Sequence, residues 1–482
     1  MRAAALLLVS QLVALSSALR RVSGPVGRRG DALRLRAAAS DAPTTATSAT
    51  ATAPPAAWER TYPAWAAEAG IAFPELRCAT FDGADASLAG GGPSMRGLGA
   101  ASTSAATLPT STPLVTLPRR ATLASSASEP LPSELREWGL AESAWDMGNS
   151  GEKLAFKLLH AMALLRRGRR LDAGPAGALD GYVAQLPGSV DTPLFWSEAE
   201  VALLADSRLA TRVDKQRERW AGLWRALETS SPAAAATTSR EELERALACV
   251  FSRAFGGKFG GSGFSRALLA AQGALAALAG AWLVADPLQH GASSAAVLVA
   301  GLGAAAALDA TAAAELVLLP VIDTANHRSN ARSTIAYNAL SDALELSFEE
   351  GGEGSGKGGI VDGASGQVFI SYGERSNEEL LLYFGFVERD KPHDAVTLVV
   401  GGGGRSGEVQ VRRGGRVDPA EAAQAGGMGA VKEAAVAELA RLDKAAASVD
   451  GPQGAEVVEA GRVDVIRAAV EERRRVLMEL VS

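Results

Sequence analysis

The chain has few residues that can hold a metal ion or form a disulfide. Only two of its 482 residues are cysteines, Cys78 and Cys249, which excludes a disulfide framework and any all-cysteine metal site. The four histidines are scattered along the sequence: His160, His290, His327 and His393. Since no two of them have the i, i+4 spacing that places two ligands on one helix face, we expect no metal.

An excess of positive charge is also missing. The formal net charge is −6, the isoelectric point is near 5.5, and no basic stripe is interleaved with aromatic residues. These features argue against a DNA or RNA partner. The hydrophobic content of 47% over 482 residues instead suits a globular protein with a large core, in two or three domains.

The N-terminal residues 1–57 have the composition of a targeting segment. Residues 3–15 form a short apolar run behind Arg2, as in a secretory signal, and residues 19–57 are rich in Arg, Ala, Ser and Thr, as in an organelle transit peptide. A signal peptide followed by a transit peptide resembles plastid targeting in algae with a secondary plastid, so we expect a location in the chloroplast stroma. The alternative is a secreted or endoplasmic-reticulum protein with a disordered neck.

Hydrophobic periodicity predicts helices in the middle of the chain and strands towards its end. One apolar stripe recurs at helical spacing, formed by Leu154, Leu158, Ala161 and Leu165. Two capping boxes predict the starts of further helices, Ser197 with Glu200 and Ser239 with Glu242. Period-two alternation predicts strands, at Leu344, Leu346 and Phe348 and again at Val368, Ile370 and Tyr372. Residues 114–119, 395–400 and 408–412 predict further strands, and 431–442 and 463–477 amphipathic helices.

Residues 267–285 and 291–308 form two apolar, alanine-rich runs around a polar break. Each run approaches the about 20 residues that span a bilayer, so a membrane hairpin is one interpretation. The others are alanine-rich helices packed on the domain and retained intron sequence. We favour these because alanine adds little transfer free energy and no Lys or Arg closes the hairpin.

Two polar motifs follow apolar runs in the C-terminal half. The segment Asp323-Thr324-Ala325-Asn326-His327 follows Ile322, and Tyr372 ends an apolar segment shortly before Ser376-Asn377-Glu378-Glu379. On general grounds the first motif is a turn held by side-chain hydrogen bonds, and the tyrosine is a packing residue.

Together these motifs resemble the paired C-terminal motifs of SET-domain protein-lysine methyltransferases, in the branch typified by the Rubisco large-subunit methyltransferase. Further matching blocks lie at 96–98, 114–119, 182–187, 191–197 and 252–255. The resemblance implies an α+β fold: short curled β-sheets with a knot-like C-terminal motif, a large helical insert and a short C-terminal helical region. It also implies that the two polar motifs fold side by side. The chain then divides into a targeting segment (1–57), the N-terminal part of the SET domain (58–130), its helical insert (131–255), the alanine-rich insertion (256–314), where the family has a much shorter connection, the C-terminal part with the motifs (315–390) and a shortened substrate-binding-like region (391–482).

The resemblance assigns roles to individual residues. Tyr372 matches the catalytic tyrosine, which orients the amine and the methyl group. The matches to contacts with S-adenosylmethionine are Arg96, Gly97, Leu98, Ser252, Asp323, Asn326, His327 and Phe386, with 96–98 as a backbone turn. The substrate end would be formed by Arg253, Phe255 and Phe384; the aromatic Phe255 favours lysine over the histidine modified by the actin-directed member of this branch. No metal is implied.

The function that the resemblance implies is S-adenosylmethionine-dependent methylation of a lysine side chain. The expected partner is a non-histone plastid protein such as the Rubisco large subunit or aldolase, acted on by a monomer. The alternative is a catalytically inactive SET-derived interaction scaffold, with membrane tethering through 267–308 as a third option. The sequence leaves open the substrate, the number of methyl groups and the nature of the insertion.

Overall fold

The computed structural model describes residues 56–82, 87–90, 94–101, 108, 112–168, 179–257, 259, 314–338, 341–348, 365–402, 405–451, 457–459 and 461–482. Contacts divide the chain after Pro54, and every described residue belongs to the unit Pro55–Ser482. The expected targeting segment, up to residue 55, and the alanine-rich runs 267–285 and 291–308 lie outside the described residues. In the described part, no helix is long and apolar enough to cross a membrane.

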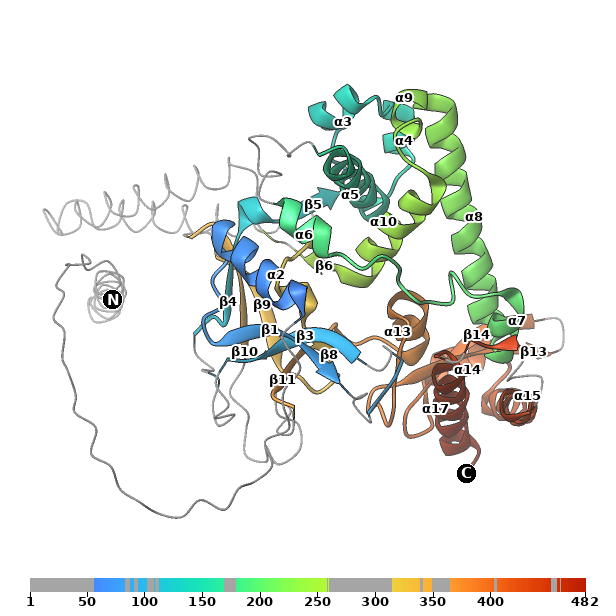
Figure 1. The fold of residues 1–482 in the computed structure, drawn as a ribbon. Helices are drawn as coiled ribbons and strands as arrows, with labels where there is room; N and C mark the ends of the chain where they lie inside the picture. Colours follow the sequence, from blue (N-terminus) through green and yellow to red (C-terminus); the bar gives the residue numbers. More distant parts are fainter. Residues whose placement is uncertain are drawn as a thin grey trace, which may run out of the picture. The chain divides into compact units, whose positions relative to one another are not determined.

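A four-stranded sheet joins the N-terminal part of this unit to the region of the two polar motifs (Figure 1). Its order is β1 (Leu76–Asp82), β3 (Ser94–Ala100), β11 (Gln367–Ile370) and β8 (Asn326–His327). Strands β1 and β3 are antiparallel, as are β3 and β11. Strands β11 and β8 are parallel, so the chain crosses over between them through β9 (Ser333–Asn338) and β10 (Ala343–Phe348).

The other sheets are small. They are β4 (Val115–Pro118)–β10–β9, β5 (Leu123–Ser126)–β7 (Glu315–Leu318)–β6 (Ala254–Gly257), β12 (Val387–Glu388)–β2 (Leu88–Ala89), and β13 (Ala395–Gly402)–β14 (Arg405–Arg412)–β15 (Arg416–Val417). Strand β10 alternates as its sequence predicts, with Leu344, Leu346 and Phe348 buried. The mixture of helices with short sheets confirms the α+β class.

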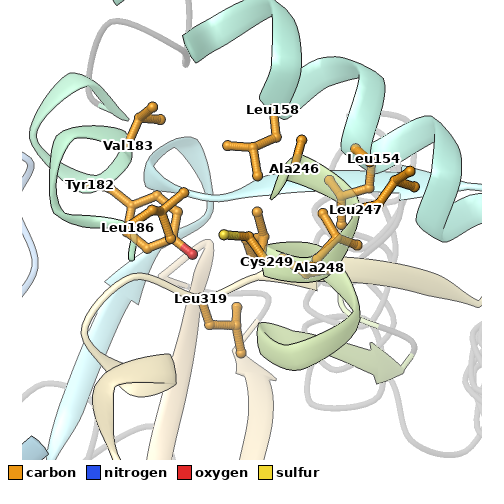
Figure 2. Packing of buried hydrophobic residues seen from close by; sticks show 14 of the residues in the cluster. Leu154, Leu158, Tyr182, Val183, Leu186, Ala246, Leu247, Ala248, Cys249 and Leu319 are labelled. Carbon is orange, nitrogen blue, oxygen red and sulfur yellow. The ribbon is translucent and has the colours of Figure 1, made fainter. Parts of the chain in front are cut away.

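Helices fill the chain between β5 and β6. They are α3 (Ser133–Trp138), α4 (Glu142–Asp146), α5 (Ser150–Arg166), α6 (Asp180–Gln185), α7 (Glu198–Leu203), α8 (Ser207–Ser230), α9 (Pro232–Ala235) and α10 (Arg240–Arg253). The boxes at Ser197 and Ser239 cap α7 and α10 as predicted. Side chains of α5, α6 and α10 converge above Leu319 at the end of β7 (Figure 2). The insert is therefore packed on the sheet that leads into the first polar motif.

The remaining helical elements are spread along the chain. They are α2 (Ala57–Glu68), η1 (Arg119–Ala121), η3 (Ile322–Thr324), α13 (Asn377–Phe384), α14 (Pro419–Gln424), α15 (Met428–Asp450) and α17 (Val463–Val481). Helices α14, α15 and α17 pack with β13 and β14 around a second apolar core. This core includes Val431, Val470 and Leu477. Both predicted amphipathic helices are thus present.

Two local expectations were wrong. Tyr372 does not end a period-two strand, because β11 stops at Ile370 and all four of its residues are buried. Both faces of this strand are covered, so the alternation of a half-exposed strand does not apply to it. The residues Arg96-Gly97-Leu98 form no turn; they lie within β3, paired with β1 along its whole length.

Candidate active site

The two polar motifs lie side by side, as the resemblance implies. Asn326 pairs with Phe369 and His327 with Ile370 in the parallel β8–β11 ladder. Beyond it, the backbone N–H of Tyr372 donates to Nδ1 of His327 at 3.0 Å. The Tyr372 hydroxyl donates to the carbonyl oxygen of Ala325 at 2.9 Å. Both ends of the tyrosine are therefore held by the segment that carries the first motif.

Aromatic rings surround Tyr372. Its ring stacks on Phe384 with centroids 4.9 Å apart, and lies edge-on to Phe386 at 6.5 Å. The imidazole of His327 contacts both Tyr372 at 4.9 Å and Phe386 at 5.9 Å. Phe384 ends α13 and Phe386 follows it, so the short helix delivers two of the four rings. The result is a half-buried tyrosine in an apolar wall.

The Tyr372 hydroxyl stays protonated at neutral pH. Burial raises its pKa to about 12, and the charge of nearby Arg253 opposes this shift without cancelling it. A neutral phenol that donates to Ala325 keeps its oxygen lone pairs available for a donor on a ligand. Tyr372 can therefore orient a nitrogen group but does not serve as a base.

A buried network lies behind His327. Because burial lowers the pKa of this imidazole and Nδ1 accepts from Tyr372, the ring proton lies on Nε2. That atom lies 3.4 Å from Oε2 of Glu388 and 3.3 Å from Oγ of Ser329. Ser329 and Lys391 both bond the Glu388 carboxylate. Burial alone would raise the pKa of Glu388, but His327, Ser329 and Lys391 outweigh it and lower that pKa to about 2.

Asp323 belongs to a second buried cluster, with its side chain 1% exposed. Its Oδ2 accepts from the Tyr182 hydroxyl at 2.7 Å and lies 3.6 Å from the Arg253 guanidinium, which also bonds the Asp323 carbonyl. Burial raises the pKa of Asp323, with Arg253 opposing. Burial alone would lower the pKa of Arg253, but the charge of Asp323 raises that pKa above its usual value. Val321, two residues earlier, has φ +71° and ψ −52°, the strained geometry of a γ-turn for a β-branched residue. Its backbone N–H donates to the Tyr62 hydroxyl.

Gly97 lets the backbone of β3 approach Asn326 closely. A Cβ at this position would lie 3.0 Å from the Phe81 ring and 3.1 Å from the side-chain nitrogens of Asn326 and Gln367. Asn326 donates to the carbonyl oxygen of Arg96 at 3.1 Å, which joins β8 to β3. Glycine is thus needed for these strands to approach, and the amide of Gln367 is left buried without a hydrogen-bond partner among the described residues.

The other predicted site residues lie on neighbouring elements. Leu98 is fully buried in the core. The Ser252 hydroxyl donates back to Ala248 of its own helix at 2.7 Å. Phe255 follows Arg253 on β6, paired with Val317 of β7. The Arg96 guanidinium lies over the Trp58 ring at 5.0 Å and bonds Gln185.

The fold that carries this geometry is similar to that of known proteins. No protein-family model and no curated protein sequence matches the chain. Solved structures do: the SET domain of LSMT bound to methyllysine and AdoHcy aligns over 89% of this chain and 91% of its own, with 14% identity and a TM-score of 0.50. The same domain bound to lysine and AdoHcy, and Rubisco LSMT bound to AdoMet, align over 88% of this chain with 14% identity and TM-scores of 0.49. The fold is that of a SET domain.

Several residues beside the candidate site could not be found from the sequence. Glu388, Lys391 and Ser329 carry no local signal, since charged residues in a sequence normally lie at the surface. Asn377 was noted only as part of a motif; its side chain bonds the Glu388 backbone in both directions and also Asp394. It thereby fixes α13 to β12. Among the described residues, no group of three or more His, Cys, Asp or Glu side chains could hold a metal ion.

Proposed function

We propose that this protein is an S-adenosylmethionine-dependent methyltransferase that modifies a lysine side chain of another protein. The observation that carries the proposal is the placement of a neutral, ring-enclosed Tyr372 hydroxyl at the Ala325 carbonyl, beside the Asn326–His327 strand. A SET domain of the same fold binds methyllysine and AdoHcy, which supports it.

The residues present suit the proposed cofactor. At the candidate site, three buried polar atoms have no hydrogen-bond partner among the described residues: Oδ1 of Asp323, Nε of Arg253 and the amide nitrogen of Gln367. Such atoms suit the ammonium, carboxylate and hydroxyl groups of this molecule. Asn326 and the backbone at Gly97 would hold its amino-acid end, and Phe386 would stack on its base. When bound, it supplies a sulfonium methyl group: the amine lone pair forms the N–C bond as the S–C bond breaks and its electrons stay on sulfur.

This chain's own residues would prepare the amine. The rings of Phe384, Phe386 and Tyr372 exclude water from the nitrogen, and burial lowers the pKa of a lysine ammonium, so its proton leaves to solvent before transfer. The nearby Arg253 charge disfavours the ammonium form further. The Tyr372 oxygen then accepts from the remaining N–H and aligns the lone pair.

The test is transfer of tritiated methyl groups to proteins of an algal plastid extract by the purified chain. Tyr372→Phe should lower transfer by about 100-fold or more, the scale for losing one preorganised polar group at a reacting centre, while cofactor affinity by calorimetry changes little. Equal activity of the two proteins would contradict the assignment. A wild-type chain that binds no S-adenosylmethionine would instead favour the scaffold alternative.

Plastid location and a target such as the Rubisco large subunit or aldolase are also part of the proposal. They rest on the composition of residues 1–57 and on the sequence resemblance. Mass spectrometry of the labelled protein would identify both the target lysine and the number of methyl groups.

A further inference from the structure

A polar cavity of about 590 Å³ adjoins the segment that carries Tyr372. One side is formed by residues 374–379, which connect Tyr372 to the first turn of α13. The start of α8 contributes Arg208 and Arg212, and the β13–β14–β15 sheet forms the other side. Its volume is in the range of sites that bind small ligands or a few side chains.

The two carboxylates in the first turn of α13 are already engaged. Glu378, with its side chain 8% exposed, accepts from Arg208 at 2.6 Å and also from Arg212. Glu379 bonds Ser376 in the capping box of α13. One buried carboxylate thus serves two arginines, whereas Glu374 of the same wall is exposed.

The opposite side carries two arginines in an unfavourable arrangement. Arg412 at the end of β14 and Arg416 at the start of β15 are direct cross-strand partners, and both are exposed. Like charges placed opposite each other in a sheet destabilise it. Among the described residues neither side chain pairs with a carboxylate; Arg416 bonds only the backbone oxygen of Arg413 at 3.2 Å. Folding gains nothing from this pair, whereas an anion from outside would relieve the repulsion.

We propose that this cavity binds the part of the protein substrate that flanks the target lysine, and that Arg412 and Arg416 select a segment with an acidic side chain. The proposal rests on the proposed function. A lysine that reaches Tyr372 must bring its neighbouring residues past Glu374, two positions along the chain and in the cavity wall. The acidic wall residues there disfavour a polyanion such as nucleic acid, so an extended polypeptide of mixed charge is the occupant that the charges fit.

Binding of fluorescent 15-residue peptides to the full chain, followed by anisotropy, tests this. Each peptide has a central lysine. One set carries aspartates on the N-terminal side of the lysine and the other on the C-terminal side, and in the matched control of each set asparagine replaces every aspartate. Wild type should bind one acidic set about three- to tenfold more tightly than its asparagine match, the scale of one or two partly exposed ion pairs. Arg412→Glu with Arg416→Glu should abolish that preference and prefer peptides in which lysine replaces aspartate.

The control is Lys215→Glu with Arg225→Glu, two exposed residues of α8 outside the cavity that change the net charge equally. It should behave as wild type. Equal binding of aspartate and asparagine peptides by wild type, or an unchanged preference in the Arg412/Arg416 variant, would overturn the proposal. Peptide binding can be measured without methyl transfer. A preference for acidic peptides without methyl transfer would therefore disprove only the proposed function. Methyl transfer without that preference would disprove only the role proposed for the cavity.

Discussion

Replacing Glu388 by glutamine removes one charge from the buried network behind His327. Glu388 is 6% exposed, and its partners Lys391 and His327 are each 1% exposed. The Glu388 pKa of about 2, against a reference of 4.5, corresponds to about 3 kcal/mol of stability at pH 7, at about 1.36 kcal/mol per pKa unit. Breaking a buried pair by removing one partner costs about 3–5 kcal/mol, because the other charge is left uncompensated. We therefore expect Glu388→Gln to lower the free energy of unfolding by about 3 kcal/mol.

Urea unfolding at pH 7.5 measures this loss, with Glu433→Gln, an exposed carboxyl on α15, as the control. The pH dependence has a definite sign. Since the folded-state pKa of Glu388 is lowered, its contribution is present above about pH 4.5 and is lost as the pH falls towards about 2. The difference between wild type and variant should shrink over that interval.

A double variant separates the pair from the rest of the network. Glu388→Gln with Lys391→Met also removes the unpaired ammonium, so it should be less destabilised than the sum of the single changes. A loss below 1 kcal/mol for Glu388→Gln, or strict additivity, would refute the view that a buried charge pair supports His327 and, through it, the Tyr372 backbone.

Two further predictions concern stability. Burial raises the pKa of Glu472 on α17 from 4.5 to about 7, so wild type loses stability as the pH rises through this interval; Glu472→Gln should be more stable by up to about 3 kcal/mol at pH 8 and equal to wild type near pH 4.5. The exposed Glu433→Gln on α15 should show no such trend, and a pH-independent difference would contradict the burial argument. Gly385→Ala should cost at least about 2 kcal/mol more than Gly427→Ala in thermal or urea unfolding: both glycines have positive φ, but only at Gly385 would a Cβ lie 1.9 Å from the Asp191 oxygen, whereas Gly427 faces open space. If the two substitutions lowered the free energy of unfolding equally, the prediction would be wrong, because the loop around Asp191 would then move aside without cost.

Local patterns predicted the elements whose signals are short-range. The box at Ser239 and Glu242 lies within one helical turn, and the alternation in β10 depends only on which face is covered. A capping box of the same kind, Asn149 with Glu152, begins α5. The alternation around Val368 misled, because the burial of β11 depends on strands from distant parts of the chain.

The site could be predicted only as far as a sequence resemblance reaches. It identified Tyr372, Asn326 and His327 as neighbours, which the β8–β11 ladder confirms. It could not indicate that Glu388 and Lys391 are buried behind His327, because their burial depends on packing between segments about sixty residues apart. Charge pairing of that kind has no periodic signature in a sequence.

A crystal structure of the chain with S-adenosylhomocysteine and lysine tests the central claim most directly. The account predicts the sulfur and the lysine nitrogen on either side of the Tyr372 hydroxyl, with the cofactor's amino-acid end at Asn326 and its base against Phe386. Either ligand bound away from the junction of β8 and β11 would contradict it.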